Sequence, residues 1–259
     1  MTIIKLKDVN LNKRNKILIK NLNLEIKENQ SWVILGRNGA GKSTLLKSIA
    51  GIESFQGKIL LFDKNILKIS SKKRAKKLGL LLQQSSSGFE NTALEMVLSG
   101  GYPNTNSWGF ESQFELDNAF HAMKEVGIEK LMNAKIGTLS GGELRRAEIS
   151  RLIMQNPNVA LLDEPLNNLD LSHQSKIITS LLNKFCSPEK SILMALHDIN
   201  LSLQIATHLL ILKGNGEWLA NKVEALRDPD LLSEYLGCHI SKYTTSDGDF
   251  FSMKHKNIL

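Results

Sequence analysis

The chain has 259 residues, a formal net charge of +7 at pH 7, 42% hydrophobic and 23% charged residues. This length suits one large domain or two closely packed ones, and the composition is ordinary for a soluble protein. The longest apolar runs, such as residues 78–82, are far too short to cross a bilayer, and the first residues lack a secretion-signal pattern. The two cysteines, Cys186 and Cys238, form neither a disulfide framework nor a metal-spaced pair. We therefore expect a cytosolic chain that reaches a membrane only through a partner.

The chain begins with segments that predict strands. Apolar residues alternate in residues 3–6 and 22–26, and residues 31–35 form a continuous apolar run typical of a buried strand. This run leads into a glycine-rich segment, after which residues 44–50 predict a helix ending near Gly51. Residues 57–62 and 78–82 predict two more strands, with a helix between them over residues 66–77.

From about Gln84 to Asn156 the pattern changes to helical segments joined by polar loops, with loop signals at residues 85–88 and 102–104. Strands and helices alternate again from Val159, with strands over 159–162 and 191–196 and a helix over 172–185. This alternation predicts an α/β core with a largely parallel sheet, into which the helical stretch is inserted. Residues 208–259 predict late strands, a short helix and a hydrophilic tail.

The glycine-rich segment has the pattern of a phosphate-binding loop placed between a strand and a helix. Its glycines allow several backbone N–H groups to point at phosphate oxygens. The lysine offers a mobile positive charge to the β- and γ-phosphates, the serine hydroxyl can ligate Mg²⁺, and the threonine can add a phosphate contact. The predicted nucleotide-binding residues are Gly36, Arg37, Asn38, Gly39, Ala40, Gly41, Lys42, Ser43 and Thr44.

The apolar strand at residues 159–162 ends in two acids, Asp163 and Glu164. A carboxylate at a strand end beside a phosphate site can organise Mg²⁺, and we assign this role to Asp163. Glu164 is the candidate general base that polarises the water attacking the γ-phosphate. Taken alone, the two acids fit a cap of the turn at Pro165 about as well as a catalytic pair.

Two further polar residues follow predicted strands. Gln83 ends the strand at residues 78–82, where a glutamine can ligate Mg²⁺ or the attacking water when ATP is present. Gln84 is the alternative, although the strand register favours Gln83. His197 ends the apolar run at residues 192–196, and a lone histidine in such a position is more often structural than catalytic.

The segment Leu139-Ser140-Gly141-Gly142-Glu143, together with the phosphate loop, resembles the ATP-binding cassette family over roughly residues 3–237. The resemblance implies a P-loop NTPase core of the α/β class with a mostly parallel sheet, an N-terminal antiparallel β subdomain and an inserted α-helical subdomain. The implied ATPase domain is 1–237, with its core at 1–83 and 158–237 and the helical insertion at about 84–157. Residues 238–259 would be a C-terminal tail.

The resemblance also implies roles for residues that the pattern alone leaves open. Ser140, Gly141 and Gly142 would meet the γ-phosphate of ATP held by the opposite subunit of a homodimer, where a hydroxyl and glycine N–H groups at a helix N-terminus form an anion site. Asp170 matches the loop that crosses the dimer interface, and it also fits a helix cap before Leu171. His197 matches a histidine that contacts the γ-phosphate. The implied ligands are ATP and Mg²⁺.

Within the family, Ser99-Gly100-Gly101-Tyr102-Pro103 and the segment 169–174 resemble ATPases of metal-chelate importers, which serve iron-siderophore, haem or vitamin B12 uptake. This implies a peripheral subunit on the cytoplasmic face of the inner membrane, with permease subunits and, indirectly, a substrate-binding protein as partners, and no nucleic acid. The alternatives are a soluble cassette ATPase acting on nucleic acid or ribosomes, and a scaffold for iron–sulfur cluster assembly.

The sequence departs from the family pattern at several positions. No aromatic residue occurs in residues 12–16, where the family usually stacks one on adenine, so Arg14 or a residue elsewhere is left for that contact. Arg37 replaces a frequent proline of the phosphate loop, and Arg145 stands where glutamine is common after LSGGE. None of these changes removes a catalytic group, so we expect an active ATPase.

Overall fold

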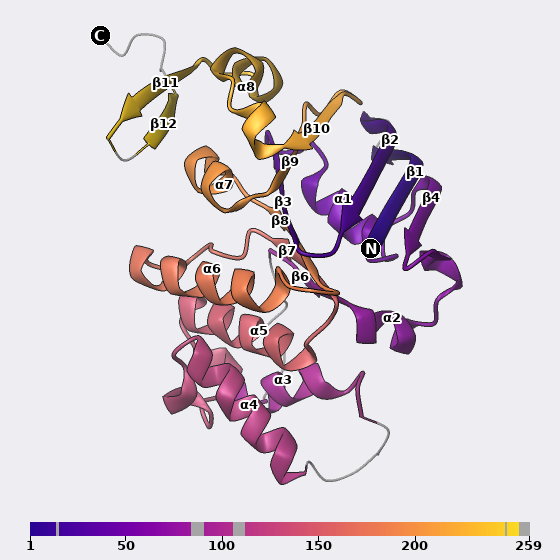
Figure 1. Ribbon diagram of the computed structural model, residues 1–259. Helices are drawn as coiled ribbons and strands as arrows, with labels where there is room; N and C mark the ends of the chain where they lie inside the picture. The colour runs from indigo at the N-terminus through magenta and orange to yellow at the C-terminus, as the bar shows by residue number, and fades with distance from the viewer. Residues whose placement is uncertain (14–15, 84–90, 106–111, 247, 254–259) are drawn as a thin grey trace.

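The computed structural model describes residues 1–259 except 14–15, 84–90, 106–111, 247 and 254–259 (Figure 1). In the described part of the chain, a six-stranded sheet has the order β10-β9-β3-β8-β7-β6. All neighbours pair in parallel except β9 and β10. The strands are β3 (Gln30–Gly36), β6 (Leu78–Leu81), β7 (Val159–Asp163), β8 (Ser191–Ala195), β9 (His208–Leu212) and β10 (Trp218–Lys222).

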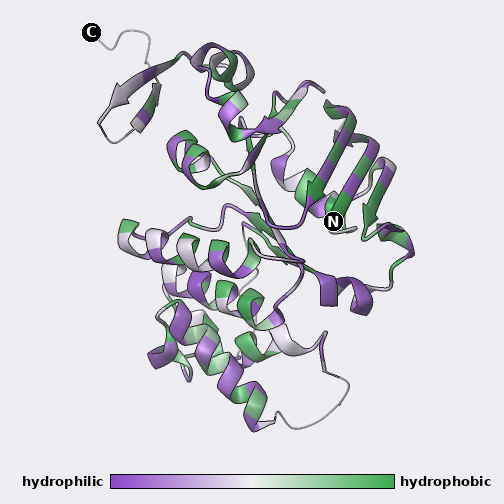
Figure 2. Cartoon of the chain, viewed as in Figure 1, coloured by the Kyte–Doolittle hydropathy of each residue, from purple (hydrophilic) through white to green (hydrophobic). Residues whose placement is uncertain are grey.

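A second, antiparallel sheet is built mainly from the N-terminal residues, with the order β2-β1-β4-β5. Its strands alternate buried apolar and exposed polar residues, which is visible as alternating colours along β1, β2 and β4 (Figure 2). One face therefore packs inward while the other meets solvent. The strands are β1 (Thr2–Lys13), β2 (Lys16–Lys27), β4 (Gln56–Leu61) and β5 (Lys64–Asn65).

The six-stranded sheet carries a hydrophobic core on each face. On β3, Trp32 and Ile34 join the core shared with the antiparallel sheet and helix α1 (Lys42–Ile49), whereas Val33 and Leu35 join the core on the opposite face. This division follows the two-residue period of a strand. The second core is covered by α3 (Ala93–Leu98), α4 (Gln113–Glu125), α5 (Gly141–Gln155), α6 (Leu171–Phe185), α7 (Ile199–Ile205) and α8 (Pro229–Leu236). The predicted fold class is confirmed.

The predicted helical stretch corresponds to α3, α4 and α5, which lie together at one end of the molecule (Figure 1). Each of these helices begins with a capping box, formed by Thr92 with Glu95, Ser112 with Glu115, and Ser140 with Glu143. The predicted loop at residues 85–88 falls outside the described residues, and residues 102–104 form a turn. None of the helices in the described ranges combines the length and apolar character that a membrane span requires.

The helix predicted over residues 66–77 is interrupted. A short 3₁₀ turn covers Ile66–Lys68, and α2 (Ser71–Lys77) starts only after Ser70. Ile69 and Ser70 have extended backbone angles, and Ser70 occupies the N-cap position of α2. Serine is favoured at such boundaries, because its side chain competes with the backbone for hydrogen bonds.

Most of the C-terminal tail expected over residues 238–259 has regular secondary structure. Strands β11 (Ile240–Thr245) and β12 (Gly248–Met253) form an antiparallel hairpin. Ile240 and Phe251 are only 2% and 3% exposed and join the second core. The side chain of Asn200 in α7 accepts from the backbone N–H of Phe251 at 2.8 Å and donates to its carbonyl at 2.9 Å. The hairpin is therefore anchored by one aromatic ring and one amide.

We expect Phe251→Ala to lower the free energy of unfolding by about 3 kcal/mol, because it removes a buried ring and leaves a cavity. Phe250→Ala is the matched control, since Phe250 is 52% exposed on the same strand. Its effect should stay within about 0.5 kcal/mol. Urea denaturation followed by circular dichroism measures both changes, and equal losses would contradict the packing of this hairpin.

Candidate active site

The predicted phosphate loop lies between the end of β3 at Gly36 and the start of α1 at Lys42. Gly39 and Gly41 have φ angles of 76° and 108°, in the left-handed region that glycine adopts easily. Gly41 is the N-cap of α1 and makes no side-chain cap hydrogen bond. The N-terminus of α1 is therefore left without a side-chain cap and suits an anion.

A cavity of about 550 Å³ opens beside this loop. The cavity is lined by most residues of the predicted phosphate loop and by the three predicted catalytic residues, which are far apart in the sequence. The lining comprises Lys13, Leu18, Asn38, Gly39, Ala40, Gly41, Lys42, Ser43, Thr44, Gln83, Glu164 and His197.

Two predicted nucleotide-binding residues do not line this cavity. Gly36 lies against β9, where an added Cβ would come within 2.5 Å of the Leu212 carbonyl oxygen, so the residue serves close strand packing. The Arg37 side chain lies beside Gly237 at the end of α8. Gln84, the alternative to Gln83, and Arg14, a candidate for the adenine contact, both fall outside the described residues. Lys13 and Leu18 are the cavity residues nearest in sequence to the expected adenine contact.

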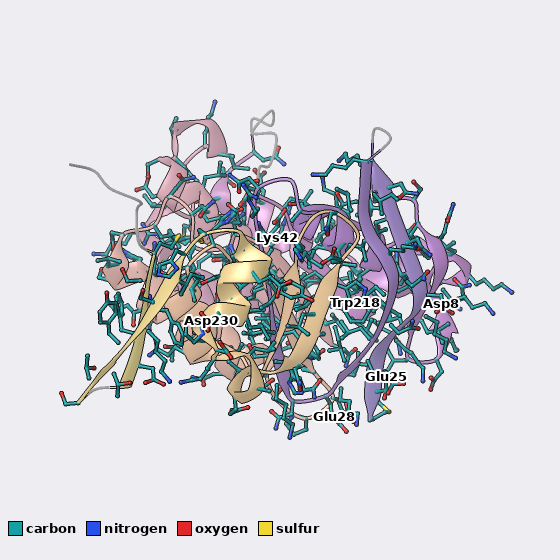
Figure 3. All side chains as sticks on the ribbon, turned by 90° about the horizontal axis from the view of Figure 1, so that it is seen from above. Asp8, Glu25, Glu28, Lys42, Trp218 and Asp230 are labelled. Atoms are coloured by element: carbon teal, nitrogen blue, oxygen red, sulfur yellow. The ribbon has the colours of Figure 1, made fainter. Side chains whose placement is uncertain are left out.

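Lys42 is only 6% exposed, and its label falls near the middle of the view from above (Figure 3). Its Nζ atom donates to the Gly36 carbonyl oxygen at 2.7 Å. Burial lowers the pKa of Lys42, while the nearby carboxylates of Glu164 and Asp163 raise it. The lysine thus brings a poorly solvated positive charge to the cavity wall, where the phosphate oxygens of a nucleotide can bind it.

The Glu164 side chain is held by three neighbours. Oε2 accepts from Gln83 Nε2 at 2.9 Å and from Asn167 Nδ2, and Oε1 contacts His197 Nε2. Glu164 is 8% exposed, with its backbone in the left-handed region at a φ of 50°. Sequence reasoning missed Asn167, for which the available signal was an amide in the turn that follows the acid. The arrangement fixes a carboxylate at the edge of the cavity.

Asp163 ends β7 and is 2% exposed. Within the described ranges its Oδ1 atom has no hydrogen-bond partner. Buried polar atoms are normally satisfied, so an unpaired carboxylate oxygen at the end of a strand marks a place where a cation or its water can bind. This fits the Mg²⁺ role predicted for Asp163, with Ser43 in the first turn of α1 as the second predicted ligand.

The predicted residues Ser140, Gly141 and Gly142 lie at the start of α5, and none of them lines the cavity. An added Cβ on Gly142 would come within 2.8 Å of the Asn168 carbonyl oxygen, so the start of α5 packs against the loop that leads into α6. Asp170 is the N-cap of α6. Most of the predicted site residues therefore fall into two groups, one at the cavity and one at the start of α5 and α6, while Gly36, Arg37 and Asp163 belong to neither lining.

Asp170 accepts from the His173 backbone N–H at 2.9 Å and from the Ser172 hydroxyl at 2.8 Å, and it contacts the His173 ring. These hydrogen bonds, with that from the His173 backbone the largest cause, hold the pKa of Asp170 well below its ordinary value of 3.8. The helix-cap role proposed for Asp170 is confirmed, and its place in a dimer interface stays a prediction.

We expect Asp170→Asn to reveal this shift, because asparagine keeps the cap but cannot titrate. A carboxylate with a lowered folded-state pKa adds stability above its unfolded pKa, and this stability is lost as the pH falls through the folded value. The difference in unfolding free energy between the parent and Asp170→Asn should therefore be full at pH 6 and smaller at about pH 3. Urea denaturation at the two values measures it, and a difference that does not shrink would contradict the lowered pKa.

The sequence matches the protein-family model described as "ABC transporter" over residues 19–167. The chain is 32% identical to the probable siderophore transport system ATP-binding protein YusV of Bacillus subtilis over 248 residues, which covers 93% of this chain and 89% of that protein. It is also 32% identical to the ferric enterobactin transport ATP-binding protein FepC of Escherichia coli, covering 75% of this chain and 72% of the relative. A haemin import ATP-binding protein, HmuV of Gloeobacter violaceus, is 35% identical over 204 residues, 76% of this chain and 73% of that protein.

Solved structures agree on the fold. A putative metal-chelate type ABC transporter in an inward-facing conformation superposes with a TM-score of 0.84 and 23% identity over the whole of both chains. The dimeric ABC transporter cassette MJ0796 superposes with a TM-score of 0.73 and 27% identity, covering 85% of this chain and 99% of that one. The family match over more than half of the chain and the relatives above 30% identity give the same assignment. The chain belongs to the ABC transporter family and is one of its ATPases.

Proposed function

We propose that this chain binds and hydrolyses ATP to drive a membrane importer for a metal chelate, an iron-siderophore, haem or cobalamin. The support comes from relatives named for siderophore, ferric enterobactin and haemin transport. Cobalamin is included because the segments at 99–103 and 169–174 resemble those of the whole metal-chelate group. The chain would work as a peripheral homodimer on the cytoplasmic face of the cell membrane.

The observation that carries the ATPase mechanism is the Glu164 carboxylate at the cavity wall, held by Gln83, Asn167 and His197. With the phosphates of ATP on the loop and Lys42, a water between the γ-phosphate and Glu164 could donate its proton toward this carboxylate. The three neighbours keep the carboxylate from rotating away, so the water is oriented before reaction. The His197 side chain is 46% exposed at the cavity and can also reach the γ-phosphate.

Mg²⁺ accompanying ATP would be held by the Ser43 hydroxyl, Asp163 and Gln83. The donor set is all oxygen, as this cation prefers, and Oδ1 of Asp163 has no hydrogen-bond partner among the described residues. When bound, the ion would neutralise charge that develops on the phosphates. Gln83 could ligate the ion through its Oε1 atom while Nε2 still donates to Glu164, so this contact would link the Glu164 carboxylate to the presence of nucleotide.

The separation of the predicted residues into two groups supports a dimer. Ser140, Gly141 and Gly142 lie outside the cavity of their own chain, at the start of α5, where Ser140 and Gly141 are exposed and the first backbone N–H groups of the helix can attract an anion. We propose that they close over ATP held by the partner chain, with Asp170 at the same interface. Binding two ATP molecules would draw the chains together, and hydrolysis would release them.

The helices α3 to α5 would pass this movement to the permease. Gln83 lies two residues after the end of β6 and precedes the helical stretch, so a change in its contacts would be passed to these helices. A substrate-binding protein would deliver the cargo to the permease from the other side of the membrane.

Affinity purification from the native membrane in mild detergent tests the transport role, with untagged cells as the control. We expect a polytopic permease to co-purify, and the ligand of an associated substrate-binding protein would name the cargo. Recovery only with ribosomes, nucleic acid or iron–sulfur assembly proteins would overturn the importer and leave the ATPase site intact.

A further inference from the structure

Arg145 is an unusually well-held charged residue outside the cavity lining. It lies in the first half of α5 and is 4% exposed. Its side-chain N–H groups all donate to oxygen atoms, of which four are backbone carbonyls outside α5 and one is the carboxylate of Glu148 on α5 itself. Nη1 donates to Leu82 O at 2.6 Å and Glu148 Oε2 at 2.8 Å, Nη2 to Asp163 O and Glu164 O at 2.8 Å each, and Nε to Pro165 O at 3.1 Å.

The backbone acceptors lie next to Gln83 and Glu164 in the sequence, the two residues whose side chains meet in the cavity. Leu82 directly precedes Gln83, and the remaining carbonyls belong to Glu164 and its two neighbours. Gln83 and Glu164 are themselves joined by a hydrogen bond of 2.9 Å. One guanidinium therefore fixes the backbone on both sides of this pair, from the end of β6 and from the end of β7.

The backbone of Glu164 needs such support. Its φ of 50° lies in the left-handed region, which is unfavourable for a residue with a side chain and persists only where the surroundings enforce it. The backbone N–H of Glu164 donates to the Ala195 carbonyl oxygen at 3.1 Å. The Arg145 side chain donates to the carbonyl of Glu164 and to the carbonyls of the residues before and after it. The direction of the Glu164 side chain follows from this backbone conformation, so Arg145 contributes to aiming the carboxylate.

We propose that Arg145 is a positioning residue, which sets the orientation of the Glu164 carboxylate relative to Gln83 without itself touching the nucleotide. This rests on the proposed catalytic role of Glu164. It also gives α5 two functions, because the helix whose first residues would face the partner's ATP holds the catalytic carboxylate of its own chain.

Arg145→Lys tests the proposal while keeping a positive charge beside the buried Glu148. A lysine has fewer donors, concentrated on one nitrogen, and cannot reach carbonyls on two strands as the planar fork does. We expect kcat for ATP to fall at least about tenfold, because small displacements of a catalytic group are costly. The dissociation constant for a fluorescent ATP analogue should stay within about twofold, because Arg145 does not line the cavity.

A double-mutant cycle separates positioning from a general structural role. In a Glu164→Gln background, adding Arg145→Lys should change the residual single-turnover rate by less than about twofold, because the group that Arg145 positions is already disabled. The same fold-loss in both backgrounds would overturn the proposal, as would a kcat within twofold of the parent for Arg145→Lys alone. Normal turnover in Glu164→Gln alone would instead refute the proposed function.

Two further variants guard against a loss of fold. Arg145→Gln/Glu148→Gln removes both buried charges together and should show the same loss of kcat, with ATP affinity retained. Arg227→Gln is the matched control, since Arg227 also donates to a backbone carbonyl, that of Leu203, at 3.0 Å and lies away from the cavity. It should keep the parent kcat, and a loss equal to that of the double variant would count against a specific role of Arg145.

Discussion

Glu164→Gln is expected to lower the rate of ATP turnover by about a thousandfold, because the amide cannot take the proton of the attacking water. The side chain keeps its shape, and glutamine can still accept from Gln83 and Asn167, which hold Oε2 of Glu164. The dissociation constant for ATP should therefore stay within about twofold of the parent value. Phosphate release under saturating ATP measures turnover, and a fluorescent ATP analogue measures binding.

Glu189→Gln is a close control for this substitution. Glu189 also has a left-handed backbone, with a φ of 62°, but it is exposed and does not line the cavity. Its turnover should stay within about twofold of the parent rate. Normal turnover in Glu164→Gln would show that the general base lies elsewhere.

Lys42→Ala is expected to weaken ATP binding by about 10- to 100-fold, because it removes a charged hydrogen-bond donor to the phosphates. The lysine is buried at the cavity wall and is held only through backbone carbonyls, those of Gly36 and Arg37, among the hydrogen bonds of the described residues. Truncating it leaves carbonyls that already take part in the strand and loop, so the fold should survive. Titration of the fluorescent analogue at constant ionic strength measures the loss.

Lys47→Ala on the same helix controls for the change of charge, since Lys47 is in the last turn of α1 and outside the cavity lining. We expect its ATP affinity to match that of the parent. Equal weakening by both substitutions would mean that the helix, or the overall charge, matters more than the phosphate contact.

The phosphate loop and the two acids could be predicted from sequence because their chemistry depends on short, contiguous spacing. Residues 36–44 run from the end of β3 into the first turn of α1, and Asp163 ends β7 with Glu164 directly after it. Parallel neighbouring strands then bring their carboxyl ends together, which places Gln83, Glu164 and His197 at one cavity. Alternating apolar residues predicted strands of the antiparallel sheet, and continuous apolar runs predicted the buried strands of the six-stranded sheet.

The environment of Glu164 could not be predicted in the same way. Arg145 reaches Leu82 and Glu164 only because α5 crosses beneath the ends of β6 and β7, and no spacing in the sequence encodes that crossing. In the sequence, Arg145 in place of the family's common glutamine looked like a neutral difference. The structure shows that the Arg145 side chain donates to four backbone carbonyls. The bounds and pairing of the hairpin at residues 240–253 were not predicted beyond the general expectation of late strands, because few of its residues are buried and its pattern is mostly polar.

The most direct test of the shared-ATP arrangement is the molar mass of purified Glu164→Gln, measured by light scattering with and without saturating ATP and Mg²⁺. This variant should bind ATP without hydrolysing it, so the closed state would accumulate. We predict the mass of one chain without nucleotide and of two chains with ATP. A mass of one chain under saturating ATP, with binding verified in the same sample, would contradict the proposal that two chains close around the nucleotide.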